Sequence, residues 1–384
     1  MKRITILILL MAILMSACNK YKKIEKVDNL TILHLNGTAY ERGLTHGQLM
    51  RNEIELIIER WKKEVEQNYQ HKFDEVIDMF FKNTTYIEVI KKYCPELLEE
   101  VYGISQGSGI DYNTILAFQM SEEIDILSDE IKSKFCTSMS INRSDNAPTF
   151  LAQNMDPPLF MHGNPTLLHI TNPQTKLESY VYTFPGFIGL NGLNSKGVAI
   201  TCNSISMLNS SSHGLPVAFI VRYILKQTHE QLAFDVLKEI PIGIPQCFTI
   251  GGIGGARCFE CSCGEIKEFY PFDNKNITLH TNFAISNRDF NKKYIELLAN
   301  YGKTIDDPYY CPRYFLAYDK IKESDFKLNK ESIQSILSLT EPEIQPISND
   351  ETYGSLIMKL SENPVLYIAP GKPDITDYIE LRFD

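Results

Sequence analysis

The sequence predicts an α+β fold in which helices and strands form separate layers. Up to about Lys134 the chain has a mainly helical pattern after one short strand. After Cys136 short β-rich runs dominate, and helices return in separate blocks, which is not the pattern of a βαβ succession. With 384 residues the chain is long enough for one large domain or two.

The first 17 residues have the pattern of a signal peptide. Lys2-Arg3 is basic, Ile4 to Met15 is an apolar run too short to span a bilayer, and Ser16-Ala17 are small. Met15-Ser-Ala-Cys18 resembles a bacterial lipobox, whose cysteine becomes the lipidated first residue. We therefore expect export, a lipid anchor on Cys18 in the cell membrane or envelope, and a polar tether over residues 18–28. The alternative is an ordinary cleaved signal peptide in which Cys18 is incidental.

Charge and cysteine content exclude some classes of protein. The formal net charge is −10 and there is no long basic run, which argues against a nucleic-acid partner and leaves lipid attachment as the membrane anchor. Nine cysteines are present, and seven, an odd number, remain when Cys18 and Cys136 are set aside. No regular disulfide framework is predicted.

The part before Cys136 begins with a strand over residues 30–35. Helical spacing then predicts one long helix from about Thr38, with an apolar face made of Ile54, Ile57, Ile58, Trp61 and Val65. Shorter helices are expected over residues 75–81, 86–93, 95–105 and 111–120.

The part from Cys136 onward reads as strands interrupted by helices. Strands are predicted over 136–142, 149–155, 178–184, 187–191, 197–203, 246–250, 265–270 and 277–281. Helices are expected over 215–227, 231–239, 288–301, 312–321 and 329–337. Three further strands, over 354–359, 364–368 and 378–383, close the chain.

Cys136 is the strongest candidate for a reactive residue. Residues 143–148 are turn-forming, so the runs on either side predict a hairpin. With the turn centred on Asn146, Cys136 and Asp156 stand directly opposite each other, with Cβ atoms about 5 Å apart. A thiol at one strand end would then lie beside a carboxylate, although a packed core cysteine remains the plain alternative.

Three polar residues at the ends of elements are further candidates. Asn203 ends the strand that follows the turn at residues 194–197, and Asn282 ends a later strand. Buried amides at strand ends can donate hydrogen bonds to a developing oxyanion, although asparagine is also a common turn former. Arg313 begins a helix after Pro312, where a surface ion pair is the alternative role.

Other chemistries have weaker signals. None of the eight histidines lies in a motif with Cys136, and packing or helix capping suits His46 better. The run from Cys258 to Cys263 lacks the second ligand pair that zinc needs, so no metal is predicted. The run from Gly251 to Gly255 lacks phosphate-loop and dinucleotide spacing, which favours a tight turn and no cofactor.

Several of these segments together resemble the penicillin acyltransferase family. These are the acyl-coenzyme A:6-aminopenicillanate acyltransferase-like proteins among the autoproteolytic N-terminal nucleophile hydrolases, and the choloylglycine hydrolases are similar more distantly. The matching segments, in chain order, are Gly37 to Gly47, Cys136-Thr-Ser, Gln153-Asn-Met-Asp156, Gly189 to Gly197, Thr281-Asn282, Arg313 and Leu366 to Pro373.

The resemblance implies a four-layer αββα fold and a precursor that cuts itself between Phe135 and Cys136. Residues 29–135 would form a helical α chain and residues 136–384 the catalytic β chain, and the two cleaved chains would associate. The new α-amine of Cys136, with a pKa of about 8, would serve as the base. Asp156 would orient this amine, and Arg313 would stabilise the nucleophile region. The backbone N–H of Asn203 and the side chain of Asn282 would line the oxyanion hole.

The expected function is that of an exported cysteine amidohydrolase or acyltransferase. It would act on a small-molecule linear amide or thioester through an acyl-enzyme on Cys136, with hydrolysis preferred because acyl-coenzyme A is not expected outside the cytoplasm. A non-catalytic surface-binding lipoprotein and a histidine-assisted cysteine peptidase are the alternatives. Two positions depart from the family pattern: Phe135 stands where penicillin acyltransferase has glycine, and Pro312 replaces the serine usually found before the arginine. Gln153-Asn154 stand where bile-salt hydrolases carry an arginine, which argues against bile salts.

Overall fold

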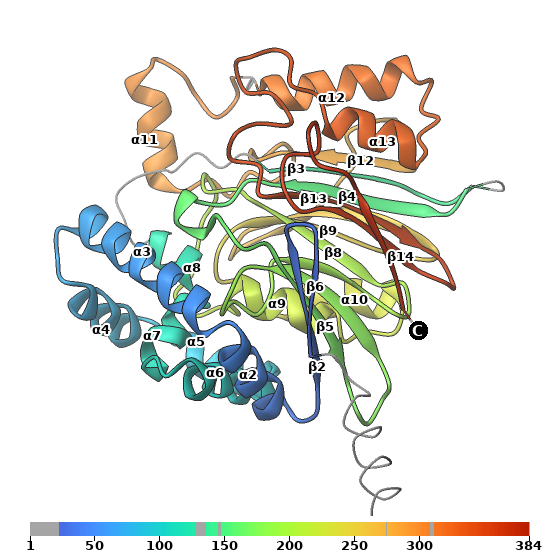
Figure 1. Ribbon diagram of the computed structural model, residues 1–384. Coiled ribbons are helices and arrows are strands. Elements are labelled where there is room, and N and C mark those ends of the chain that lie inside the picture. Colours follow the sequence, from blue (N-terminus) through green and yellow to red (C-terminus); the bar gives the residue numbers. More distant parts are fainter. Residues whose placement is uncertain (1–22, 127–135, 145–146, 274, 308–310, 384) are drawn as a thin grey trace, which may run out of the picture.

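Two stacked β-sheets form the middle of the molecule in the computed structural model (Figure 1). The structure describes residues 23–126, 136–144, 147–273, 275–307 and 311–383. The predicted signal peptide, Cys18 and Phe135 lie outside these residues. Within the described ranges no helix is long and apolar enough to cross a membrane.

The larger sheet has nine strands in the order β1-β2-β5-β6-β7-β8-β9-β10-β11. All neighbours in this sheet are antiparallel except β2 and β5, which are parallel. The strands are β1 (Ile24–Val27), β2 (Leu30–Asn36), β5 (Thr166–Thr171), β6 (Glu178–Thr183), β7 (Asn191–Asn194), β8 (Ala199–Ser204), β9 (Gln246–Gly252), β10 (Gly255–Cys261) and β11 (Ile266–Phe269).

The smaller sheet has six antiparallel strands in the order β12-β3-β4-β13-β14-β15. They are β12 (Ile277–His280), β3 (Thr137–Ile141), β4 (Thr149–Met155), β13 (Gly354–Leu360), β14 (Val365–Ala369) and β15 (Ile379–Arg382). Strands β3 and β4 of this sheet pack against β8 and β9 of the larger one.

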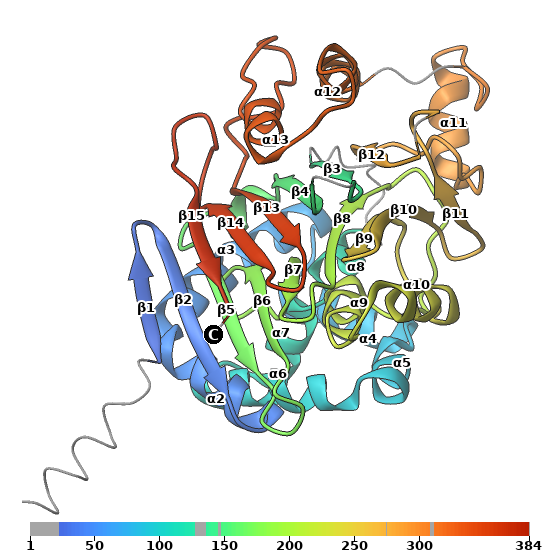
Figure 2. The ribbon, with the colours of Figure 1, turned by 90° about the vertical axis from the view of Figure 1, so that its right-hand side faces the viewer.

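Helices cover the two outer faces of this sandwich (Figures 1 and 2). On the larger sheet lie α2 (Ala39–Leu49), α3 (Arg51–Tyr69), α4 (Phe73–Asn83), α5 (Tyr86–Tyr93), α6 (Pro95–Ser108), α7 (Tyr112–Phe118), α8 (Ser121–Ile126), α9 (Val217–Ile224) and α10 (Glu230–Glu239). On the side of the smaller sheet lie α11 (Lys292–Asn300), α12 (Pro312–Glu323) and α13 (Lys330–Leu337). The predicted αββα arrangement is therefore confirmed.

The prediction of one long helix from Thr38 is wrong, because the structure has two successive helices, α2 and α3, in this segment. Thr38 does begin α2, with a capping box to Glu41, but the chain leaves helical geometry at Met50 before α3 starts. The path of α2 is set by close packing on α6, where glycines of both helices meet. The apolar face of α3 instead contacts the core, so the two helices need different directions.

Three strands were missed and one was misplaced. The run 187–191 is not a strand, because Phe187 and Ile188 are buried in a loop that follows Gly186 at φ +79°, and β7 begins only at Asn191. Strands β1, β5 and β10 were not predicted. The glycine run does make the predicted tight turn, since Gly252 and Gly255 pair across the β9–β10 hairpin.

The segments before and after Cys136 share one apolar core. Strand β2 lies inside the larger sheet beside β5, and buried side chains of the early helices pack with those of the later strands. Trp61, for example, contacts Phe118, which in turn contacts Phe184. Burial of this shared apolar surface is the dominant stabilising term for both segments.

Candidate active site

The β3–β4 hairpin carries Cys136 and Asp156, but in a register that differs by one residue from the prediction. Thr137 pairs with Asn154, and an isolated bridge joins Ser144 to Ala147. The hairpin is therefore centred half a residue before Asn146. Continued by one step, this register places Cys136 opposite Met155, so the predicted direct opposition of Cys136 and Asp156 is wrong.

Cys136 and Asp156 are nevertheless in contact. The backbone N–H of Asp156 donates a hydrogen bond to the Cys136 thiol. Burial, followed by the negative charge of Asp156, raises the pKa of this thiol to about 12, and the positive charge of Arg313 opposes the rise. A thiol with this pKa is protonated at neutral pH, so it needs a base before it can attack a carbonyl.

Asp156 is a buried acid whose carboxylate accepts hydrogen bonds from the side chains of Asn349 and Thr352, which oppose the effect of burial on its pKa. Its Oδ2 accepts a hydrogen bond from Asn349 Nδ2 at 2.9 Å, and burial raises its pKa to about 6 against the opposing charge of Arg313. Among the described residues no group donates to the buried Oδ1. A carboxylate oxygen of this kind is costly unless a donor reaches it.

Arg313 joins the nucleophile to Asn282. Its Nη1 donates to the carbonyl of Cys136 at 2.7 Å and to Thr137 Oγ1 at 3.0 Å, and its Nη2 donates to Asn282 Oδ1 at 3.3 Å. Arg313 is only 2% exposed, which excludes the surface position considered as the alternative. Pro312, at the first position of α12, starts the helix and so directs Arg313 inward.

Asn282 and Asn203 have different surroundings. Asn282 lies two residues beyond the end of β12, and its Nδ2 donates to the carbonyl of Ser204 at 3.2 Å. Asn203 is fully buried between the sheets, where its Nδ2 donates to the His280 carbonyl at 3.5 Å and its Oδ1 accepts from Gln153 Nε2 at 3.4 Å. The Asn203 side chain therefore belongs to a buried amide network.

The register of β8 on β9 decides which backbone N–H groups at the end of β8 point away from β9. Ile205 N–H donates to the Pro245 carbonyl, and Asn203 pairs with Cys247 in the same register. Hydrogen bonds alternate along an antiparallel ladder, so Asn203 directs its N–H toward β9 and Ser204 directs its own toward the opposite edge. That edge has no strand partner here, because β7 pairs with β8 only at Ile200 and Ala199 among the described residues.

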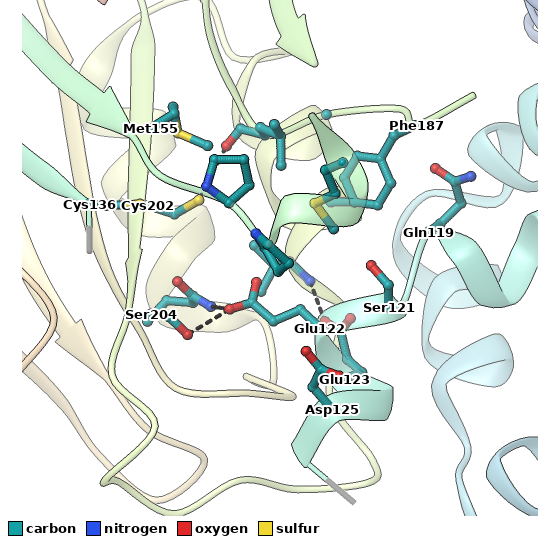
Figure 3. A pocket seen from close by; sticks show the side chains of 18 of the residues that line it. Gln119, Ser121, Glu122, Glu123, Asp125, Cys136, Met155, Phe187, Cys202 and Ser204 are labelled. Atoms are coloured by element: carbon teal, nitrogen blue, oxygen red, sulfur yellow. Dashed lines mark hydrogen bonds between the residues drawn. The ribbon is translucent and has the colours of Figure 1, made fainter. Parts of the chain in front are cut away.

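A cavity of about 70 Å³ opens beside Cys136 and is shown in Figure 3. Met155 and Phe187 lie on one side of it, and Glu122, Glu123 and Asp125 lie on the other. The full lining comprises Gln119, Ser121, Glu122, Glu123, Asp125, Cys136, Met155, Asp156, Pro157, Pro158, Met161, Phe187, Gly189, Leu190, Cys202, Ser204, Val217, Ala218 and Gln246.

Sequence reasoning missed the residues of α8 and the partners of Asp156. Glu122 and Ser121 lie in a helix of six residues with no motif around it, and Asn349 lies in a loop before β13. Only the three-dimensional structure brings these segments to Cys136.

Two buried histidines, His46 and His280, are occupied away from Cys136. His46 is buried in α2, where its Nε2 accepts from the Gly186 N–H at 2.9 Å, and burial lowers its pKa to about 4. His280 is 2.9 Å from Glu260 Oε1 through Nε2 and 2.8 Å from the Thr281 carbonyl through Nδ1. Both ring nitrogens of His280 thus face acceptors, which makes it an imidazolium and not a base.

Parts of this chain are similar in sequence to known proteins. Residues 141–296 match the family described as acyl-coenzyme A:6-aminopenicillanic acid acyl-transferase. The chain is 29% identical over 264 residues to protein dcd1A of Dictyostelium discoideum, a match that covers 61% of this chain and 58% of that protein. It is 25% identical to the 40 kDa form of acyl-coenzyme A:6-aminopenicillanic-acid-acyltransferase of Emericella nidulans, over 65% of this chain and 62% of that protein.

The structure also resembles solved structures, but with low sequence identity and low TM-scores. A variant of conjugated bile acid hydrolase from Clostridium perfringens has 13% sequence identity and a TM-score of 0.40, and it covers 65% of this chain and 97% of that chain. Penicillin V acylase from Agrobacterium tumefaciens has 15% identity and a TM-score of 0.39, covering 65% and 86%. The family match and the Emericella relative confirm the predicted resemblance to penicillin acyltransferase, over parts of this chain that span less than two thirds of the length of these relatives.

Proposed function

We propose that the chain is a self-processing cysteine amidohydrolase whose nucleophile is Cys136. The observation that carries the proposal is the buried Oδ1 of Asp156, which lies beside Cys136 and has no donor among the described residues. An α-amine released on Cys136 would supply that donor. The carboxylate would in turn hold the amine beside the thiol.

The first step is self-cleavage of the bond between Phe135 and Cys136. The Cys136 thiol attacks the Phe135 carbonyl, the C–N bond breaks, and the acyl group passes to sulfur as a thioester while the amine nitrogen takes up a proton. Water then hydrolyses the thioester, which leaves a carboxylate on Phe135 and a free α-amine on Cys136. The hydrogen bond from Arg313 to the Cys136 carbonyl fixes the backbone on the other side of this bond.

Turnover then uses the α-amine as the base. An ordinary α-amine has a pKa of about 8, which leaves a useful neutral fraction at physiological pH, so the amine can take the thiol proton as sulfur attacks the substrate carbonyl. The protonated amine gives this proton to the leaving nitrogen. Water, activated by the same amine, hydrolyses the acyl-enzyme and restores the thiol. This cycle requires no histidine.

The oxyanion would be held by Asn282 and by the end of β8. Asn282 Nδ2 carries two hydrogens, one of which bonds the Ser204 carbonyl. Asn203 was expected to supply the second donor through its backbone N–H, but that group points toward β9. We assign this role to the adjacent N–H of Ser204, which faces the open edge of β8 and belongs to a residue that lines the cavity.

Export and lipid anchoring are part of the same proposal and rest on the sequence of residues 1–18. In that compartment water is the expected acyl acceptor, and the substrate is a small-molecule acyl amide or thioester. The resemblance to an acyl-coenzyme A-dependent transferase keeps acyl transfer to an amine as the second candidate function.

A thiol-reactive acyl amide analogue tests the proposal directly. Both Cys136 and Cys202 line the cavity, so peptide mapping after labelling identifies the reactive sulfur. We expect the label on Cys136, its loss in Cys136→Ala, and its retention in the matched control Cys202→Ala. A single unprocessed chain that takes up no label would favour the non-catalytic binding lipoprotein instead, and activity without a cut would favour the histidine-assisted peptidase.

A further inference from the structure

Cys247 and Cys258 lie in contact on neighbouring strands of the larger sheet, β9 and β10 (Figure 2). Cys247 stands opposite Glu260 in the register of this hairpin. Cys258 stands opposite Thr249, so the two cysteines are diagonal neighbours on one face of the sheet. Their sulfur atoms are 3.0 Å apart, both side chains are fully buried, and the structure describes both as free thiols.

The proposed catalytic cavity and metal binding do not explain this contact. Neither cysteine lines the cavity beside Cys136. Among the residues that the structure describes, no group of three or more histidine, cysteine, aspartate or glutamate side chains could hold a metal ion. Two thiols that face each other across adjacent strands can, however, be joined by a covalent bond.

The groups around the pair favour Cys258 as the more nucleophilic sulfur. Burial disfavours its thiolate, but a hydrogen bond from the Cys247 thiol and the charge of His280 outweigh burial and lower the pKa of Cys258. Burial raises the pKa of Cys247 well above its usual range, and the hydrogen bond to Cys258 adds to this rise. A thiolate beside a thiol suits exchange with a disulfide, because the thiolate attacks first.

We propose that Cys247 and Cys258 form a disulfide bond when the chain folds in the presence of a disulfide oxidant. The Cys258 thiolate attacks one sulfur of the oxidant, the S–S bond of the oxidant breaks, and one half leaves as a thiol after taking up a proton. The Cys247 thiol then loses its proton and attacks the Cys258 sulfur of this mixed disulfide, which releases the second half as a thiol. The two cysteines are oxidised, and the oxidant disulfide is reduced to two thiols.

Burial determines when the bond can form. In the finished fold both sulfurs are inaccessible to an oxidant, because strands of the smaller sheet pack on β9 and β10. The β9–β10 hairpin is local in the chain, however, with its turn between Gly252 and Gly255, so the two cysteines can meet early in folding. An exported chain would fold where disulfide oxidants are present. The proposal needs only the oxidant, so it is independent of the function proposed for Cys136.

The bond would link two strands that support the proposed oxyanion donors. Cys247 of β9 also stands opposite Asn203, near the end of β8. Glu260 of β10 accepts hydrogen bonds from the N–H groups of three residues in the loop that follows Asn282. A disulfide between β9 and β10 would therefore restrict relative movement of the strands on which both segments are held.

Refolding of the uncut Cys136→Ala protein from urea with oxidised glutathione tests the proposal. Free thiols are alkylated in denaturant before any reduction, and peptide mapping then identifies the linked cysteines. We expect a link between Cys247 and Cys258 as the main disulfide, with the buried Cys94 and Cys311 alkylated. Refolding with reduced glutathione alone should give no link.

Cys261→Ala is the matched control, because Cys261 is equally buried in β10 but projects from the opposite face of the strand. The link should persist in this variant and be lost in Cys247→Ala. Cys258→Ser serves as a second variant should Cys247→Ala fail to refold. In the parent protein the oxidised form should have a Tm about 4 °C above that of the reduced form, because the bond restricts the unfolded chain. This difference should vanish in Cys247→Ala.

Three results would overturn the proposal. The first is alkylation of both cysteines after refolding with oxidised glutathione, and the second is a main disulfide that survives in Cys247→Ala. The third is a linked protein with a lower Tm than its reduced form, which would show that the native strands do not accommodate the bond. None of these results bears on Cys136, whose labelling tests the proposed function separately.

Discussion

At Cys136 a thiol and a carboxylate share a site in which neither ionises easily. Burial is the first cause of both raised pKa values, about 12 for Cys136 and about 6 for Asp156. This arrangement disfavours a thiolate at Cys136, because the negative charge of Asp156 repels it. It suits a site that receives an amine, since the amine would bond to Asp156 and take the proton of Cys136.

Replacement of Asp156 should therefore stabilise the uncut protein. The raised folded-state pKa of Asp156 favours the native state only at low pH: this contribution is complete below the unfolded value of 3.8 and is lost as pH rises through about 6. At pH 7.5 the ionised group thus carries a net cost of roughly 2–3 kcal/mol. In a Cys136→Ala background, Asp156→Asn should raise Tm at pH 7.5.

Thermal unfolding at two pH values gives the control for this effect. At pH 3.5 the carboxyl is protonated in the folded state and mostly protonated in the unfolded state, so the two proteins should unfold at nearly the same temperature. A lower Tm for Asp156→Asn at pH 7.5 would show that the carboxylate is already satisfied in the uncut chain, contrary to the account.

At the residue scale, the sequence points to candidates where a residue has a partner close in the chain or lies in a family motif. Cys136, Asp156, Asn282 and Arg313 could be named, and the structure brings them together. The one-residue register difference could not be foreseen, because a half-residue shift of the turn changes every pair in the hairpin.

Helices α2 and α6 meet at the closest helix crossing of the N-terminal segment, and glycines make it possible. A Cβ on Gly43 would lie 1.8 Å from the Glu100 carbonyl oxygen, and one on Gly103 would lie 2.3 Å from that of Tyr40. Backbone atoms cannot move aside as a flexible side chain can. The crossing therefore tolerates only glycine at these positions.

Gly43→Ala should destabilise the protein by about 2 kcal/mol or more, because the two helices must separate to admit a methyl group. Urea denaturation of the uncut Cys136→Ala protein measures this change. Glu99→Ala, at an exposed position of α6, is the matched control and should shift stability by less than about 0.5 kcal/mol. Equal stability of the two variants would mean that the helices are not packed this closely.

The loop after β12 depends on one buried acid. Glu260 accepts hydrogen bonds from the N–H groups of Ile285, Ser286 and Asn287, and it pairs with His280. These bonds lower the pKa of Glu260 and raise that of His280, although burial opposes both shifts. The loop that follows Asn282 is thereby held against β10.

Glu260→Gln should destabilise the protein by about 3 kcal/mol, because one partner of a buried ion pair is left alone. The Glu260 contribution is present above its unfolded pKa of 4.5 and is lost as pH falls through its lower folded value. The His280 contribution is present below 6.5 and is lost as pH rises through its higher folded value. The loss in Glu260→Gln should thus be largest between pH 4.5 and 6.5 in urea titrations, and a pH-independent difference would contradict the ion pair.

The bounds of helices and strands were predicted accurately where local sequence patterns determine where an element begins and ends. Strand β4 and helix α5 were predicted with the bounds that the structure has, since each is delimited by turn or proline residues. The break at Met50 and the missed strands β5 and β10 depend on packing partners distant in the chain. Periodicity within one segment contains no information about those partners.

On the scale of the whole molecule, the two segments separated by the proposed cut are interleaved. Beyond the shared sheet, Arg42 of α2 and Arg222 of α9 both bond to the buried Glu100 of α6. Arg222 lies after the cut, and Arg42 and Glu100 lie before it. Cleavage should therefore leave a single particle made of two chains.

The αββα layering could be predicted, because strand and helix blocks and the family resemblance both point to it. The sharing of the larger sheet could not be, since the parallel pair of β2 and β5 joins residues more than a hundred positions apart. Local sequence patterns do not encode such a pairing. The expected division at Cys136 is thus a division of the chain and not of the folded core.

Intact mass spectrometry of the purified protein, under native and denaturing conditions, tests the central claim most directly. We expect one particle in native spectra that separates on denaturation into two chains, the heavier beginning at Cys136, while Cys136→Ala gives one full-length chain. Wild-type protein that hydrolyses an acyl amide as a single uncut chain, or Cys136→Ala that still splits at the same bond, would contradict the account.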